Sequence, residues 1–240
     1  MHAMMMKLMT IFAAFCLIAS SARAEIKVSS DALGHRVARK LRALGFEVTE
    51  ADIPAYSKEL LSQESGFNAL AGIFGFDEKR DRMEMFLALM NAGLGEYDYD
   101  TGTWTPTSSQ VYAFDAEVFD IEHMYTLFLR GVESIVPGLT ISDVQEDLSG
   151  IKEDSGMSMA LTDGIRSVRF LCNGHAYETE LESMGDWFNP LFIDFVNTAL
   201  EQEGFKDRLH VVSGEMEQMV IIIYGNEERA GKIRSSIGMY

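Results

Sequence analysis

Cysteine and proline are scarce in this chain. Its 240 residues include two cysteines, Cys16 and Cys172, and four prolines. Cys16 lies in an N-terminal segment that we expect to be removed, which leaves Cys172 alone and excludes an internal disulfide. We therefore expect the fold to be stabilised by burial of apolar side chains, which make up 47% of the sequence.

Positive charge is also scarce. The 20 Lys and Arg residues stand against 37 Asp and Glu residues, so the formal net charge is −17 at pH 7. Nucleic acids and anionic membrane surfaces repel such a chain, and we expect neither as a partner. The excess of acid fits a cationic partner, divalent ions, or solubility alone.

Motifs of several common enzyme classes are absent. The sequence has no His-x-x-x-His and no Cys-x-x-Cys pair of the kind that binds zinc. It also lacks the Gly-x-Ser-x-Gly of serine hydrolases, the phosphate-binding P-loop and the Gly-x-Gly-x-x-Gly of dinucleotide-binding folds. We therefore expect no cofactor.

Long hydrophobic runs are confined to the N-terminus. Lys7 precedes an apolar stretch from Leu8 to Ala19, and Ala22-Arg23-Ala24 fits a signal-peptide cleavage site. This stretch is too short for a bilayer, which needs about 20 residues. We expect residues 1–24 to be a cleaved signal peptide, and the mature protein to be secreted to the periplasm or beyond without stable membrane insertion. The net charge then changes from −17 to −19, because two cations and no acids are lost.

The most informative stretch contains Cys172-Asn173-Gly174-His175, an Asn-Gly pair between two strand-like runs. Such a pair predicts a two-residue type I′ turn, because that turn needs positive φ at both central positions. The resulting register places Phe170 opposite Tyr177 on the apolar face. The opposite charges of Arg169 and Glu178 then pair on the other face.

The remaining C-terminal elements predict an α+β fold. Asn189-Pro190 is typical of a helix start, and Gly204 is typical of a helix end. The unbroken apolar run from Met219 to Ile223 indicates a strand covered on both faces, and Asn226 begins a last helix. We predict a C-terminal antiparallel sheet in ββαββα order with helices on one face.

Residues 25–137 are predicted to form a mainly helical lobe with a β-ribbon. Helix starts are indicated at Ser30, Asp77 and Asp120, whereas residues 96–118 alternate as strands do. Pro137-Gly138 ends the third helix and marks the best internal boundary. The second, α+β lobe then spans 139–240. We expect these two segments to be either separate domains or two lobes of one fold.

Aromatic residues interleaved with acids mark the best candidate for binding. Tyr97, Tyr99, Trp104 and Tyr112 lie on the predicted ribbon, with Phe114 following. Such rings can stack on sugars or bind a cationic peptide. The alternative interpretation is that they form the buried face of the first lobe.

Two weaker candidates concern chemistry and metal binding. Cys172 and His175 become cross-strand neighbours in the predicted hairpin and could form a thiolate–imidazolium pair, although a hairpin tip supplies no oxyanion donors. Asp98, Asp100 and Gly102 partly match a calcium loop, but Ser109 occupies the position where such a loop has its bidentate Glu.

The leading hypothesis is an exported, non-catalytic binding protein. It would engage a protein, peptide, glycan or cationic partner through an aromatic and acidic surface. An exported hydrolase that uses carboxylates or the Cys172/His175 pair is the alternative, and a calcium-binding module is the third.

Overall fold

A computed structural model describes residues 30–54, 77–98, 103–152, 163–213 and 218–237, and the fold is α+β. The helices are α2 (Ser30–Ala43), α4 (Asp77–Gly93), α5 (Met124–Ile135), α6 (Leu191–Gln202) and α7 (Glu227–Ile237), with short 3-10 turns η1 (Glu50–Asp52) and η2 (Ile121–His123). The strands are β1 (Glu96–Asp98), β2 (Thr103–Thr105), β3 (Val111–Asp115), β4 (Ile141–Asp147), β5 (Ile151–Lys152), β6 (Asp163–Cys172), β7 (His175–Glu182), β8 (Arg208–Val211) and β9 (Met219–Gly225).

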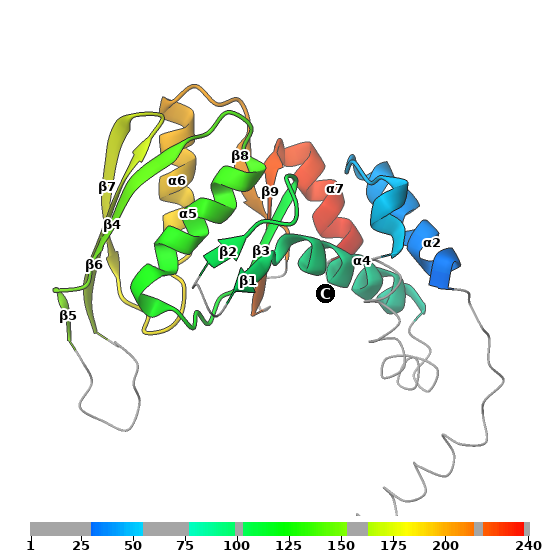
Figure 1. Cartoon of the computed structure of the whole chain (residues 1–240), viewed down its shortest axis with the longest axis horizontal. Helices are drawn as coiled ribbons and strands as arrows, with labels where there is room; N and C mark the ends of the chain where they lie inside the picture. Colours follow the sequence, from blue (N-terminus) through cyan, green and yellow to red (C-terminus); the bar gives the residue numbers. More distant parts are fainter. Residues whose placement is uncertain (1–29, 55–76, 99–102, 153–162, 214–217, 238–240) are drawn as a thin grey trace, which may run out of the picture.

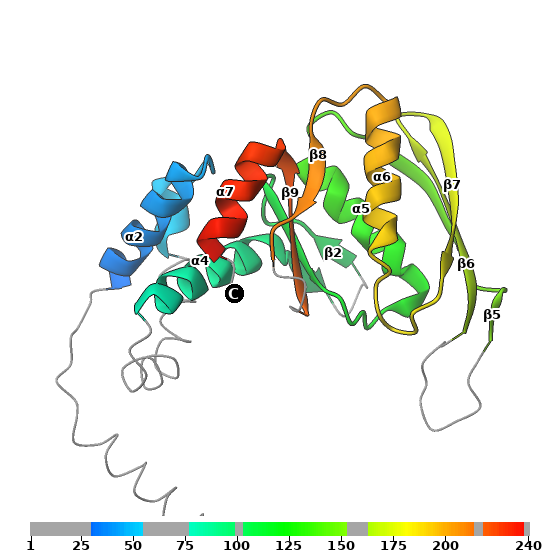
Figure 2. The same ribbon diagram turned by 180° about the vertical axis from the view of Figure 1, so that it is seen from behind.

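The two larger sheets and the helices stack in alternating layers (Figures 1 and 2). One sheet contains β4, β6 and β7, with β5 at one end of β6, and the other has the order β3-β9-β8. Helices α5 and α6 lie between the sheets, and α2, α4 and α7 cover the far side of β3-β9-β8. All strand pairs are antiparallel.

Strand β9 is the central strand of its sheet, as the unbroken apolar run predicts. Ile221, Ile222 and Ile223 are all fully buried. Ile222 packs with α5 and α6, whereas Ile221 and Ile223 pack with α2, α4 and α7. Two hydrophobic cores therefore share this one strand, one on each face of the sheet.

The predicted hairpin is confirmed in turn and register. Asn173 has φ +48° and Gly174 has φ +89°, and Cys172 pairs with His175. Phe170 pairs with Tyr177, and Arg169 pairs with Glu178. The Asn173 carboxamide oxygen also accepts a hydrogen bond from Thr140 N at 2.9 Å, which ties the turn to the start of β4.

The predicted ends of the C-terminal helices are also confirmed. Asn189 Oδ1 accepts a hydrogen bond from Leu191 N at 3.0 Å, while Pro190 already has helical backbone angles. Gly204 follows α6 with φ +80°. Asn226 Oδ1 accepts from Arg229 N at 2.9 Å at the start of α7.

The order of C-terminal elements is the predicted ββαββα, but its strands do not form one sheet. Strands β6 and β7 join β4, whereas β8 and β9 join β3. Helices also cover both faces of β3-β9-β8 rather than one, because α6 and α7 lie on opposite sides of it. The intervening α6 carries the chain from one sheet to the other.

Strand pairing crosses the boundary predicted at Pro137-Gly138. Strand β3, from the predicted first lobe, pairs with β9 along its whole length, from Val111–Ile223 to Asp115–Met219. Helix α5 packs in one core with Val168, Phe170 and Phe192 of the second lobe. The segments 25–137 and 139–240 thus contribute to common cores in the described part of the chain.

Candidate functional site

A pocket of about 520 Å³ opens where strand β3 ends and the chain leads toward α5. Its walls come from the β1–β2 hairpin, from β3 and the segment after it, and from the first turns of α5. The lining residues are Leu94, Tyr97, Trp104, Tyr112, Ala113, Phe114, Asp115, Glu117, Val118, Phe119, Asp120, Met124 and Leu127. We call this the aromatic pocket.

The β1–β2 hairpin fixes two of the rings. Tyr97 and Trp104 are direct partners across the two strands. The Trp104 indole N–H donates a hydrogen bond to Leu94 O at 2.7 Å, which sets the orientation of the ring. Gly95, with φ +69°, allows this close approach, because a Cβ there would lie 2.5 Å from the indole. The indole is therefore held firmly in the pocket wall.

Tyr112 lines the pocket and also belongs to the hydrophobic core. It is 4% exposed, stacks on Phe114 with ring centroids 5.3 Å apart, and meets Trp104 edge to face at 5.5 Å. Its ring lies on Gly131 of α5, where any Cβ would overlap it. Burial raises the pKa of Tyr112, so its hydroxyl stays neutral under physiological conditions.

The end of β3 and the segment after it carry acidic side chains. Asp115 Oδ1 accepts a hydrogen bond from Glu117 N at 2.9 Å, and Glu117 accepts from Gln218 Nε2 at 3.0 Å. Asp120 caps η2 by accepting from His123 N at 3.2 Å. Among the lining residues that the structure describes there is no Lys or Arg. Asp120 also lies 3.1 Å from His123 Nδ1. The pocket thus combines apolar walls with carboxylates.

The structure brings together three of the predicted binding residues. Tyr97, Trp104 and Tyr112 all line the aromatic pocket, and Tyr97 is 38% exposed. Tyr99 lies outside the described residues. Tyr112 is 4% exposed and belongs to the hydrophobic core, as the alternative interpretation expects. The binding role of the cluster stays a prediction.

Sequence reasoning missed the apolar contribution of the segment after β3. Phe119 is fully exposed and lines the pocket, as do Met124 and Leu127. The available signal was the apolar pair Val118-Phe119 between Glu117 and Asp120. The exposure of Phe119 could not be predicted from it, because the pair lies outside a periodic element.

The hairpin tip positions Cys172 and His175 differently. Cys172 points into the core between β6 and α6 and is 1% exposed, and burial raises the pKa of its thiol to about 11. His175 is exposed, and its Nδ1 lies 2.9 Å from Glu203 Oε1. The Tyr177 hydroxyl donates to the same carboxylate at 2.6 Å. Glu203, at the end of α6, is a partner that sequence spacing did not reveal.

This arrangement does not favour nucleophilic catalysis. A thiol with a raised pKa remains protonated near neutral pH, whereas thiol catalysis needs the thiolate. The second contribution to that raised pKa is the negative charge of Glu203, which also opposes the thiolate. The His175–Glu203–Tyr177 bonds instead join the β6–β7 hairpin to the end of α6.

The structure describes only one of the three residues that match a calcium loop. Asp98 ends β1, whereas Asp100 and Gly102 lie outside the described residues. Within the described ranges, no group of three or more His, Cys, Asp or Glu side chains is placed to hold a metal ion. No helix in those ranges is both long and apolar enough to cross a bilayer.

Comparisons with known proteins found no matching family model, no matching curated protein and no matching solved structure.

Proposed function

We propose that this protein is an exported, non-catalytic binding protein and that the aromatic pocket holds an apolar group bearing a positive charge. The observation that carries the proposal is the meeting of Tyr97, Trp104 and Tyr112 with Asp115, Glu117 and Asp120 around one pocket. Aromatic faces and carboxylates both attract a cation, and burial of an attached hydrocarbon against the apolar walls is favourable.

The volume of the pocket fits a side chain or a small molecule and not a large ligand. About 520 Å³ lies within the range of pockets that bind small molecules, roughly 300–1,000 Å³. A side chain of a peptide or a small organic cation fits this volume. A glycan would stack on the same rings and could donate hydroxyls to the same carboxylates, but it carries no positive charge for them to attract.

The test compares three probes that share one hydrocarbon chain. We expect isothermal titration calorimetry of the mature chain to show binding of octylammonium, weaker binding of octanol and none of octanoate. Binding of octylammonium should weaken as salt rises, because screening reduces the attraction of the carboxylates.

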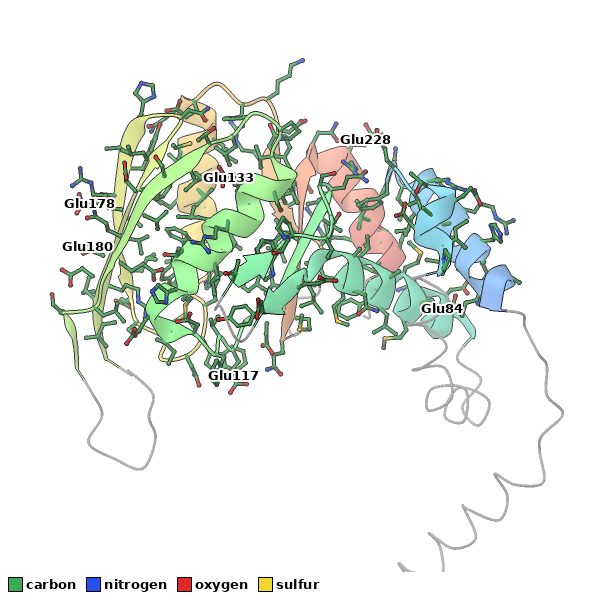
Figure 3. All side chains as sticks on the ribbon, in the orientation of Figure 1. Glu84, Glu117, Glu133, Glu178, Glu180 and Glu228 are labelled. Carbon is green, nitrogen blue, oxygen red and sulfur yellow. The ribbon has the colours of Figure 1, made fainter. Side chains whose placement is uncertain are left out.

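Two exposed variants locate the site. Tyr97→Ser and Glu117→Gln should each weaken octylammonium binding, whereas Glu178→Gln, on the outer side of β7 (Figure 3), should leave it unchanged. Equal affinity for octylammonium and octanoate would refute the proposal, as would unchanged binding in both pocket variants.

A further inference from the structure

Exposed apolar side chains gather beside the aromatic pocket. Among the described residues, the large hydrophobic side chains that are exposed are Tyr97 (38%), Phe119 (100%), Ile165 (42%), Met184 (49%), Trp187 (44%) and Leu191 (62%). Tyr97 and Phe119 line the pocket. Clustered exposure of this kind, unlike scattered single residues, is typical of interaction surfaces.

Backbone pairing holds this exposed group together. Trp187 forms isolated β-bridges with Glu117 and with Met184. Val118 N donates to Asp186 O at 2.7 Å, and Phe188 N donates to Ala116 O at 2.8 Å. The segment that carries Phe119 is therefore fixed against the segment that carries Met184 and Trp187, and Leu191 starts α6 just beyond. We call Phe119, Met184, Trp187 and Leu191 the apolar ridge.

The segments around the ridge are rich in acids. Residues 94–98, 103–124 and 183–191 contain Glu96, Asp98, Asp115, Glu117, Asp120, Glu122 and Asp186, and no Lys or Arg. The Arg166 guanidinium reaches Ile121 O at 2.8 Å, but it is buried and paired with Glu146. Helices α2 and α7 carry cations as well. The ridge is thus an apolar strip within an acidic surface.

We propose that the apolar ridge and the aromatic pocket together dock a basic amphipathic segment of another protein. Its apolar face would cover the ridge, its basic side chains would meet the surrounding carboxylates, and one anchor side chain would enter the pocket. This inference rests on the proposed function and names its partner.

Charge complementarity selects this occupant. A second copy related by a two-fold axis would place one acidic ridge against another, and like charges across an interface disfavour association. An anionic membrane surface is repelled for the same reason. A segment that carries Lys or Arg beside apolar residues can pack on the ridge and form ion pairs with the surrounding carboxylates.

The test uses a fluorescent synthetic helix-forming peptide of leucine and lysine, with the leucines at i, i+3, i+4 and i+7. One matched peptide has glutamate in place of lysine, and another has the leucine–lysine composition in an order that abolishes the apolar face. Fluorescence anisotropy with the mature full chain should show binding of the first peptide, at least about tenfold weaker binding of the scrambled peptide, and none of the glutamate peptide.

Ridge variants separate this inference from the proposed function. Met184 and Trp187 belong to the ridge but do not line the pocket. The double variant Met184→Ser/Trp187→Ser should weaken peptide binding about tenfold and leave octylammonium binding unchanged. The matched control is Leu171→Ser, a half-buried residue near the opposite end of the β6–β7 hairpin.

Charge variants test the acidic surroundings. Glu117→Gln/Asp186→Asn should weaken peptide binding and reduce its dependence on salt. Glu178→Gln/Glu180→Gln, which removes the same charge from the outer side of β7 (Figure 3), should change neither.

Three results would overturn the inference. They are equal affinity for the ordered and scrambled peptides, unchanged binding in the ridge variant, and a dimer of the mature chain that the ridge variant dissociates. If octylammonium still binds in any of these cases, the proposed function stands and only the peptide partner is lost. If octylammonium fails as well, both are refuted.

Discussion

Arg166 and Glu146 form a buried ion pair that fastens α5 to the sheet β4-β6-β7. Both side chains are 3% exposed, and Arg166 Nη1 lies 3.2 Å from Glu146 Oε2. Arg166 Nη1 also donates to Ile121 O at 2.8 Å, and Glu146 Oε1 accepts from Thr126 N and Thr126 Oγ1, both at 2.8 Å. Glu146 thus satisfies a backbone N–H in the first turn of α5. Burial raises its pKa, and the bonds from Thr126 and the charge of Arg166 oppose that rise.

Removing one member of this pair should be costly. Arg166→Met leaves the Glu146 carboxylate buried without its counter-charge, and we expect a loss of about 3–5 kcal/mol in the free energy of unfolding. Urea denaturation measures it. Adding Glu146→Leu should recover part of the loss, because no unpaired charge remains. Arg169→Met, on the exposed face of the same strand, should cost no more than about 1 kcal/mol. Equal losses at Arg166 and Arg169 would contradict this account.

The Glu203 carboxylate makes stability depend on pH. Hydrogen bonding from the Tyr177 hydroxyl, followed by interaction with His175, lowers the pKa of Glu203 below its ordinary value of 4.5. A carboxyl with a lowered folded-state pKa stabilises the fold above its unfolded pKa, and this contribution is lost as pH falls through the folded value.

Tyr177→Phe removes the strongest cause of that lowering. We expect the wild type to have a larger free energy of unfolding than Tyr177→Phe. This difference should be largest at pH 6 to 7 and should shrink as pH falls below about 4.5. Urea denaturation across that range measures the difference. A difference that grows toward acid pH would show that the hydroxyl does not act through the carboxylate.

At the residue scale, sequence reasoning found side chains that belong to regular elements and missed those that meet through tertiary contacts. Tyr97, Trp104 and Tyr112 were identified because strand alternation and aromatic clustering are visible in order along the chain. Glu203 lies 28 positions from His175, and nothing local links them. The approach of Tyr112 to Gly131 is equally invisible, since it depends on how α5 packs on β3.

Among the elements, the β6–β7 hairpin depends most clearly on local backbone conformation. Gly174 has φ +89°, and nothing lies within 4 Å of where its Cβ would be. Gly174→Ala should therefore destabilise the fold by about 1–2 kcal/mol through backbone strain alone. Gly231, in helix α7, has equally open surroundings and no positive φ. Gly231→Ala should stabilise by about 0.5–1 kcal/mol. Thermal or urea unfolding measures the change in stability that each variant causes. If both variants were stabilising or both destabilising, positive φ at Gly174 would not explain the result.

The prediction of elements succeeded where a local signal fixes a conformation. The Asn-Gly turn, the Asn189 and Asn226 caps and the unbroken apolar run of β9 each specify structure within a few residues. The partition of strands into two sheets carries no such signal, because β3–β9 pairing joins residues more than 100 positions apart. The residues of a turn therefore predict which strands pair within a hairpin. They do not predict which sheet the hairpin belongs to.

For the whole molecule, the shared sheet implies that neither predicted lobe is self-sufficient. A fragment of residues 139–240 lacks β3 and α5, which leaves Ile222, Phe170 and Phe192 without the side chains that cover them. We expect this fragment to lose cooperative unfolding, whereas the mature chain unfolds in one transition. Far-ultraviolet circular dichroism during urea denaturation distinguishes these outcomes. A cooperative transition in the fragment would support two independent domains instead.

Export is the other expectation at this scale. If residues 1–24 are a signal peptide, the secreted protein begins at Glu25 and carries a net charge of −19. Intact mass spectrometry of protein recovered from the periplasm or the medium reads the cleavage position directly. Full-length protein that remains in the cell would contradict the secretory interpretation.

Amide nuclear magnetic resonance with octylammonium tests, at the site itself, whether the aromatic pocket binds a cationic apolar group. The Trp104 indole N–H and the amides of residues 115–120 should shift together and saturably, while the amides of β7 should not. Octanoate should produce no such shifts. Shifts confined to other surfaces, or equal shifts with octanoate, would contradict the account.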